Sequence, residues 1–239
     1  MRRSQKRRTF LAGLGAGLAL HGTRAQAAQA VDLQLVLAAD VSRSIDQHRF
    51  ELQRQGYAAA IADPRVVRAM TGGRNGCLAL TYNEWSGPGA QRTLVDWTLI
   101  RGQDDAEDFA ARLLVPPRPF AGATAIGEAI GYAMGEFRRC PYAAERRTID
   151  ISGDGTNTNG TPAGIARDVA VEAGITINGL AILNENPSPW NPNHTHPPGG
   201  LDEWFRTHVI GGPGAFLLSV MGFDTFAYAM VNKLSRETS

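Results

Sequence analysis

Short apolar segments alternate with stretches of helical periodicity along most of this chain, and this alternation constrains the fold most strongly. The segment 33–39 (LQLVLAA) is nearly continuous in apolar residues, which is typical of a strand buried on both faces of a parallel sheet. Similar strand-like segments are 77–82, 93–99, 148–152, 175–183 and 215–220. Helical patterns separate most of them, the clearest with apolar residues at 126, 130, 133, 134 and 137.

Strands separated by helices predict an α/β fold with a doubly wound central sheet and helices on both faces. One pair of strands is different, because only the turn-rich sequence Ser86-Gly-Pro-Gly89 and a few further residues separate 77–82 from 93–99. These two segments are expected to form a hairpin. We therefore expect a mostly parallel sheet with one antiparallel edge strand.

The first 30 residues have the pattern of an export signal. Arg7 and Arg8 precede an apolar stretch at 10–20, and small-residue cleavage sites follow at 25–30. This order resembles a twin-arginine signal peptide, although a basic, unstructured terminus is the alternative. We expect residues 1–30 to be the signal and residues 31–239 to form a single exported domain, periplasmic or secreted. No later segment has eighteen uninterrupted apolar residues, so no membrane span is expected after cleavage.

Charge excludes one class of partner. The chain has 24 Lys+Arg and 23 Asp+Glu, but six of the basic residues and none of the acidic ones lie in 1–30. The remainder, 18 basic against 23 acidic side chains, is mildly acidic, and its only lysine is Lys233. Nucleic-acid binding, which depends on basic side chains that neutralise phosphates, is therefore not expected.

The cysteine content leaves one question open. Cys77 and Cys140 are the only two cysteines, and an oxidising compartment would permit a disulfide between them. Two unpaired thiols in the core are the equal alternative.

Three polar loops, each next to a predicted strand or helix, are expected at one edge of the sheet. Asp40-Val-Ser42-Arg-Ser44 follows the first strand, Gly122-Ala-Thr124 opens the clearest helix, and Ser152-Gly-Asp154-Gly155 ends the strand at 148–152. In doubly wound sheets ligands bind outside the carboxyl ends of the strands. The three loops are therefore expected to converge.

This ordered set of loops resembles the von Willebrand factor A (vWA) domain and its metal-ion-dependent adhesion site. The resemblance covers about residues 32–236, and the stretches 84–89 and 209–216 resemble a bacterial vWA-like family of unknown function. It implies a vWA-type doubly wound fold, a non-enzymatic role in protein–protein interaction, and a cation site made by Asp40, Ser42, Ser44, Thr124 and Asp154.

The chemistry of these residue types agrees with that implication. Two carboxylates and three hydroxyls are hard oxygen donors, which suit Mg²⁺ first and also Mn²⁺ or Ca²⁺, rather than soft-ligand metals. A cation with an open position would favour an acidic side chain from a protein partner. The structural alternative is that Asp40 and Asp154 cap helices and the hydroxyls bind loop amides.

Four other features are candidates of lower specificity. Glu84 and Trp85 end a strand at the same edge and are expected to contact a partner or to pack in the hairpin. Asp150, inside a buried strand, needs a partner or a protonated state, and we expect a buried salt bridge, for example to an arginine. The loop at 184–200 is too long for a plain connection. Its histidines 194 and 196, like His208, are expected to be solvated, because their spacing fits no zinc pattern.

Enzymatic motifs are missing from the sequence. No G-x-S-x-G, G-x-x-x-x-G-K or H-E-x-x-H pattern occurs. The alternative function is a metal-dependent hydrolase or phosphotransferase that uses Asp40 and Asp154.

Overall fold

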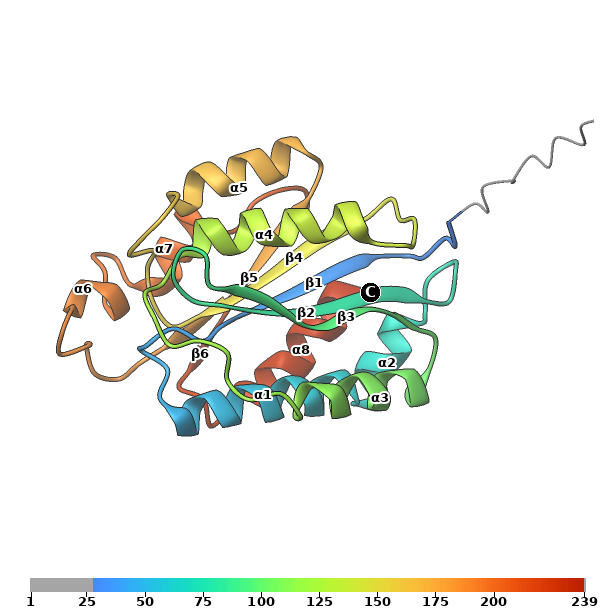
Figure 1. Cartoon of the computed structure of the whole chain (residues 1–239), viewed down its shortest axis with the longest axis horizontal. Coiled ribbons are helices and arrows are strands. Elements are labelled where there is room, and N and C mark those ends of the chain that lie inside the picture. The colour runs from blue at the N-terminus through green and yellow to red at the C-terminus, as the bar shows by residue number, and fades with distance from the viewer. Residues whose placement is uncertain (1–27, 239) are drawn as a thin grey trace, which may run out of the picture.

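The computed structural model describes residues 28–238, and these residues form one six-stranded sheet covered by helices on both faces (Figure 1). The strands are β1 Gln34–Asp40, β2 Leu78–Trp85, β3 Gln91–Ile100, β4 Arg147–Gly153, β5 Thr176–Leu183 and β6 Leu217–Met221. The helices are α1 Gln47–Ile61, α2 Pro64–Met70, α3 Gln103–Leu113, α4 Ile126–Arg139, α5 Ala163–Glu172, α6 Pro192–Thr195, α7 Leu201–His208 and α8 Phe226–Thr238.

The strand order is β3-β2-β1-β4-β5-β6, and only the β2–β3 pair is antiparallel. The predicted fold class is therefore confirmed, including the antiparallel edge strand. β1 lies between β2 and β4, where side chains cover both of its faces. All seven of its residues are buried, as the near-continuous apolar run predicts.

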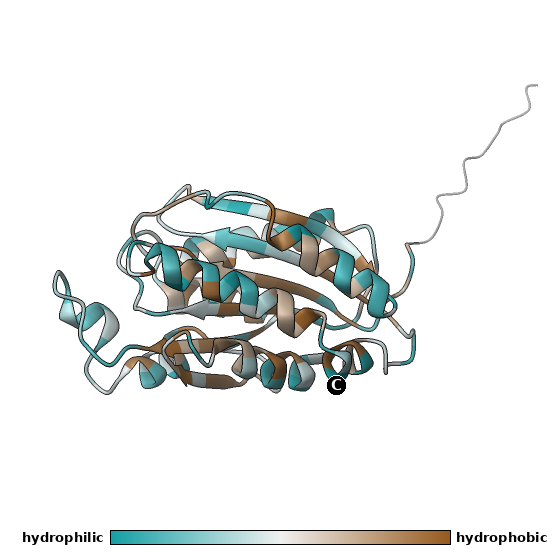
Figure 2. Ribbon diagram, turned by 90° about the horizontal axis from the view of Figure 1, so that it is seen from below, coloured by the Kyte–Doolittle hydropathy of each residue, from teal (hydrophilic) through white to brown (hydrophobic). Residues whose placement is uncertain are grey.

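Two hydrophobic cores lie on opposite faces of the sheet. In β1, Leu35 and Leu37 contribute to one core, which α1, α2, α3 and α8 cover. Val36 and Ala38 point the other way, into the core beneath α4, α5 and α7. This alternation follows from the period of two in a strand. Figure 2 shows hydrophobic residues along the strands, while hydrophilic residues interrupt the outer helices.

Asp63 and Pro64 separate α1 from α2. Pro64 is the first residue of α2, and Asp63 is its N-cap. Proline fits this position because its missing N–H needs no partner there, and the Asp63 carboxylate accepts from Arg65 N. A residue pair that stops one helix therefore starts another.

The buried carboxylate of Asp150 has a different partner from the one expected. Lys233 on α8 forms an ion pair with Asp150, and both side chains are fully buried. Glu237, one turn later on α8, lies 3.3 Å from the same ammonium group. The expected buried salt bridge is present, but its cation is a lysine instead of an arginine, because α8 lays its single lysine across β4.

The cysteines and the termini complete the description. Cys77 and Cys140 are both free thiols in the structure, so the disulfide is not formed. Between residues 28 and 238, no helix is long and apolar enough to cross a membrane. The signal-peptide prediction falls almost entirely on residues 1–27, outside the described residues.

Candidate functional site

The carboxyl ends of β1 and β4 meet at the point where the sheet changes direction. From β1 the chain proceeds outward to β2 and β3, whereas β4, β5 and β6 extend the other way. Asp40 is the last residue of β1, and Asp154 directly follows β4. Thr124 lies two residues before the first residue of α4. The fold thus places the three predicted loops at the crevice where ligands of doubly wound sheets bind.

The five predicted residues lie together there. Ser44 Oγ donates to Asp154 Oδ1 at 2.5 Å, and Ser42 Oγ lies 3.1 Å from Ser44 Oγ. Thr124 Oγ1 donates to Ser42 Oγ at 3.1 Å. Asp40 joins the group through Oδ1, which accepts from the backbone N–H of Ser42 at 2.7 Å. Apart from half-buried Ser44, these side chains are buried.

Two carboxylates in this small volume repel each other. Burial raises the pKa of Asp40 well above its ordinary value, and the charge of Asp154 raises it further. The pKa of Asp154 is also raised by burial, although the Ser44 hydroxyl opposes the shift. Within the described residues, Asp40 Oδ2 has no hydrogen-bond partner despite being buried. Such an atom is costly unless something positive approaches it.

The donor atoms have the spacing of a coordination shell. An octahedral ion with bonds of about 2.1 Å holds neighbouring ligand atoms about 3 Å apart. The contacts Asp154–Ser44, Ser44–Ser42 and Ser42–Thr124 span 2.5–3.1 Å. A divalent cation would neutralise the two carboxylates and supply the partner that Asp40 Oδ2 lacks. The residues present therefore fit a hard dication.

The first loop is held by groups that the sequence analysis did not identify. One guanidinium nitrogen of Arg118 donates to the carbonyls of Val41, Ser42 and Ile45 at 2.8–2.9 Å. Gln53 on α1 donates to the carbonyl of Asp40 at 2.8 Å. An arginine 73 to 77 residues away leaves no local signal, since its role depends on tertiary structure.

The second loop is held from the end of β2. Ser86 Oγ accepts from Gly122 N at 2.8 Å and donates to Ala123 O at 3.1 Å, and its carbonyl accepts from Ala125 N. Thr124 itself exchanges hydrogen bonds with Thr158. Ser86 therefore fixes the backbone on both sides of Thr124.

Glu84 and Trp85 do not form a partner surface. Glu84 is fully buried and paired with Arg54 through contacts of 2.7 and 3.0 Å, and Trp85 is 1% exposed. The prediction of partner contact was wrong because both side chains point inward, where α1 covers Glu84 and the second core covers Trp85.

The histidine at 194 lies at the site rather than in solvent. His194 is buried, with Nε2 3.4 Å from Thr124 Oγ1 and Nδ1 3.5 Å from Thr156 Oγ1. The expected solvation therefore holds for exposed His196 but not for His194. His208 is half-buried and stacks on Trp204. In the described part of the chain, no three or more His, Cys, Asp or Glu side chains are grouped so that they could hold a metal ion.

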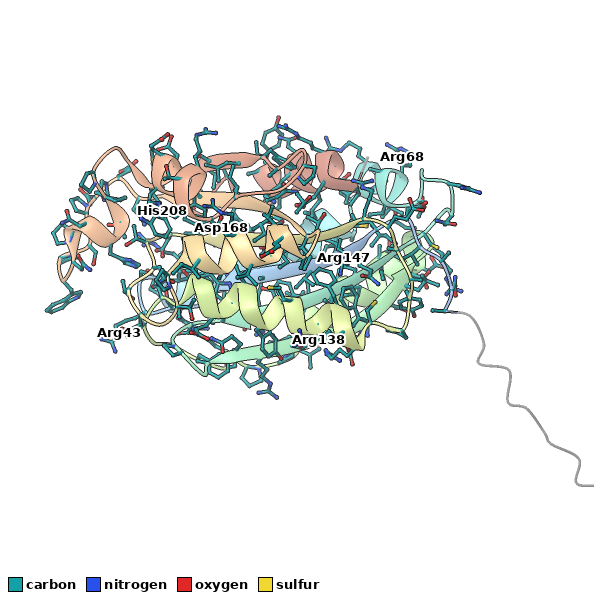
Figure 3. All side chains as sticks on the ribbon, turned by 90° about the horizontal axis from the view of Figure 1, so that it is seen from above. Arg43, Arg68, Arg138, Arg147, Asp168 and His208 are labelled. Carbon is teal, nitrogen blue, oxygen red and sulfur yellow. The ribbon has the colours of Figure 1, made fainter. Side chains whose placement is uncertain are left out.

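A cleft of about 500 Å³ opens beside the converging loops. Its lining includes Arg43, Ser44, Thr124, Trp190 and His194. Trp190, in the 184–200 loop, is 92% exposed. Arg43 projects from the molecule at the same end as α6 (Figure 3). Two of the predicted oxygen ligands, Ser44 and Thr124, thus border a cleft with a cationic and an aromatic side chain at its rim.

A protein-family model matches nearly the whole of the described chain. The family model described as "Protein of unknown function (DUF1194)" matches residues 30–239. The chain belongs to the DUF1194 family. No curated protein sequence matches this DUF1194 protein.

Solved structures share the vWA fold with the DUF1194 chain. A structure of proximal thread matrix protein 1 (PTMP1) from the mussel byssus, with a zinc-occupied MIDAS motif, superposes with a TM-score of 0.60 at 13% identity. The alignment covers 87% of this chain but 46% of PTMP1, so the chain spans less than half the length of that protein.

Two bacterial structures agree. A von Willebrand factor type A protein from Catenulispora acidiphila has a TM-score of 0.52 and 17% identity, covering 87% of this chain and 43% of that one. The vWF domain of the type V pili tip protein Mfa5 from Porphyromonas gingivalis has a TM-score of 0.53 and 10% identity, covering 87% and 95%. At these identities the likeness shows the vWA-like fold alone, as the sequence resemblance implied.

Proposed function

We propose that this protein binds a divalent cation through Asp40, Ser42, Ser44, Thr124 and Asp154 and uses it to hold an acidic group of a protein partner. The observation that carries the proposal is the coordination-shell spacing of oxygens from three loops, next to a buried carboxylate oxygen without a partner. The role is non-enzymatic, in keeping with neighbours that include a pilus adhesin and a pilus tip protein.

The proposed cofactor is Mg²⁺, with Mn²⁺ or Ca²⁺ as alternatives, because the oxygen donors are hard. The zinc-occupied MIDAS motif of PTMP1 supports a divalent cation at this place in the fold. With the three hydroxyls bound directly and an aspartate acting through a water, the ion stays electron-poor at its open position, so a carboxylate from another molecule is a favourable further ligand.

The cleft supports an acidic partner. Arg43 is exposed at its rim. Positive side chains around a cation attract acidic surfaces over several ångströms. Trp190 offers the kind of aromatic anchor that is common in protein interfaces.

Export by the twin-arginine pathway to the periplasm or cell exterior remains part of the proposal. It depends on the Arg7-Arg8 pattern and the apolar stretch that follows it. A fusion of residues 1–30 to a folded reporter tests it: export should be lost when both arginines are replaced by lysine. Export that persists in the lysine variant would contradict the twin-arginine route.

Calorimetric titration of Mg²⁺ and Mn²⁺ tests the cation site. Titration of wild type should produce a heat of binding, and titration of Asp154→Ala should produce none. Asp168→Ala, which removes an exposed carboxylate on α5, should behave as wild type. Equal heats for wild type and Asp154→Ala would refute the site.

Assay of the same proteins separates binding from catalysis. Cation-dependent capture of a partner from a periplasmic extract, reversed by EDTA and lost in Asp154→Ala, supports the adhesion role. Turnover of p-nitrophenyl phosphate that Asp40→Ala abolishes would instead support the hydrolase alternative.

A further inference from the structure

The long loop at 184–200 is fixed to the site. Thr156 N donates to the carbonyl of His194 at 2.8 Å, directly beyond the third ligand loop. Asn184 Nδ2 lies 3.5 Å from Asp154 Oδ2 at the start of the loop. Inside the loop, Ser188 N donates to Thr195 Oγ1 at 2.9 Å. These contacts place one particular side chain of the loop, His194, against the predicted ligands.

The imidazole of His194 continues the series of donor atoms. Its exposed fraction is 7%. Nε2 lies 3.4 Å from Thr124 Oγ1, a separation close to those between the oxygens themselves. The donors therefore run from Asp154 through Ser44, Ser42 and Thr124 to a nitrogen at the far end.

The orientation of the ring is determined by its neighbours. Nδ1 lies 3.5 Å from Thr156 Oγ1, and a hydrogen bond from Nδ1–H to that hydroxyl leaves the electron pair of Nε2 for the site. Gly155 leaves room for the ring, because a Cβ there would lie 2.1–2.6 Å from three of its atoms. A glycine next to Asp154 thus permits the close approach of the imidazole.

We propose that His194 Nε2 is an additional ligand at this cation site, so that the site binds borderline dications such as Zn²⁺ and Co²⁺ more tightly than its oxygens alone would. The inference rests on the proposed cation site and deepens it. The set would be mixed, with hydroxyls, carboxylate and one imidazole. Nitrogen ligands suit Zn²⁺, Co²⁺ and Ni²⁺, whereas Mg²⁺ is held by oxygens.

Zn²⁺ and Mg²⁺ titrations of three variants test this ligand. His194→Ala and His194→Gln should lose zinc affinity by about tenfold or more while Mg²⁺ affinity changes by less than about twofold. The control is His196→Ala, which removes an exposed histidine two residues away in the same loop. It should bind both ions as wild type does.

Visible absorption of the Co²⁺-loaded protein provides a second measurement that does not depend on affinity. The bands of wild type should shift in His194→Ala and remain in His196→Ala, since the bands report the ligand atoms. Unchanged zinc affinity and unchanged cobalt bands in both His194 variants would overturn the inference. An equal loss of zinc affinity in His196→Ala would also overturn the inference, because that result would place the ion on the surface of the loop.

The outcomes separate this inference from the proposed function. If wild type binds Mg²⁺ and Asp154→Ala does not, the cation site stands. If the His194 variants then bind zinc as tightly as wild type, only the imidazole ligand is refuted. If wild type and Asp154→Ala bind both ions equally, the cation site itself is refuted and this inference with it.

Discussion

The hydroxyl of Ser44 lies 2.5 Å from Asp154 Oδ1, although 110 residues separate them in the chain. The contact joins the loop after β1 to the loop after β4, which are adjacent strands. It is the shortest link in a series of polar atoms that continues through Ser42 to Thr124. The sheet order therefore creates the site, because strands distant in sequence end side by side at its switch point.

Replacement of Arg118 by alanine should weaken cation binding. Its guanidinium donates to three carbonyls of the loop that presents Ser42 and Ser44, and hydrogen bonds from a charged donor contribute about 1.5–3 kcal/mol each. We expect Mg²⁺ affinity to fall by about tenfold or more, measured by calorimetry. Arg43→Ala, which removes an exposed arginine of the same loop, should leave Mg²⁺ affinity near wild type; equal losses in both variants would contradict a positioning role for Arg118.

Asp40→Asn should stabilise the cation-free protein and abolish its response to cations. The substitution removes one of two repelling, buried carboxylates. Loss of this repulsion should raise the free energy of unfolding by about 1–3 kcal/mol. Urea unfolding in EDTA at pH 7 should show a higher midpoint than wild type. Added Mg²⁺ should raise the wild-type midpoint only. A lower midpoint in EDTA would argue against strain between the two aspartates.

Loss of Lys233 should be the most destabilising single change outside the cores. Its ammonium group is fully buried against Asp150 and Glu237, and removal of one partner from a buried ion pair costs about 3–5 kcal/mol. Chemical unfolding of Lys233→Ala measures this loss. Arg236→Ala, on an exposed position of the same helix, should lose under about 1 kcal/mol. A loss of stability under about 1 kcal/mol in Lys233→Ala would mean that the ion pair is not buried.

Stability should fall between about pH 4.5 and pH 7, and Glu237 should cause part of the fall. Burial raises the pKa of Glu237 from 4.5 to about 7. In that window the folded protein holds more protons than the unfolded chain, so the free energy of unfolding decreases as pH rises. Glu237→Gln should reduce this decrease in the free energy of unfolding by about 3 kcal/mol at most. A profile of the same steepness in the variant would contradict the raised pKa.

The fold and the convergence of the five candidate residues were predictable because their signals are local. The run that forms β1 is buried on both faces, and the D-x-S-x-S sequence follows it directly. The parallel sheet then brings Asp40 and Asp154 to one edge without further information.

The residues that support the site were not predictable, because each acts through tertiary contacts. Arg118 and Ser86 look like ordinary loop residues, and His194 lies in a segment without periodicity. The inward orientation of Trp85 depends on the helices that pack over β2. Both faces of β2 are covered at its end, and the sequence of the strand does not show which elements cover them.

Anomalous diffraction from crystals soaked in MnCl₂ tests the central claim most directly. We predict one strong Mn²⁺ peak at bonding distance, about 2.2 Å, from the hydroxyls of Ser42, Ser44 and Thr124, and no peak there in Asp154→Ala crystals. Wild-type crystals without a peak among these hydroxyls, under conditions that saturate Mn²⁺ binding in solution, would contradict the account.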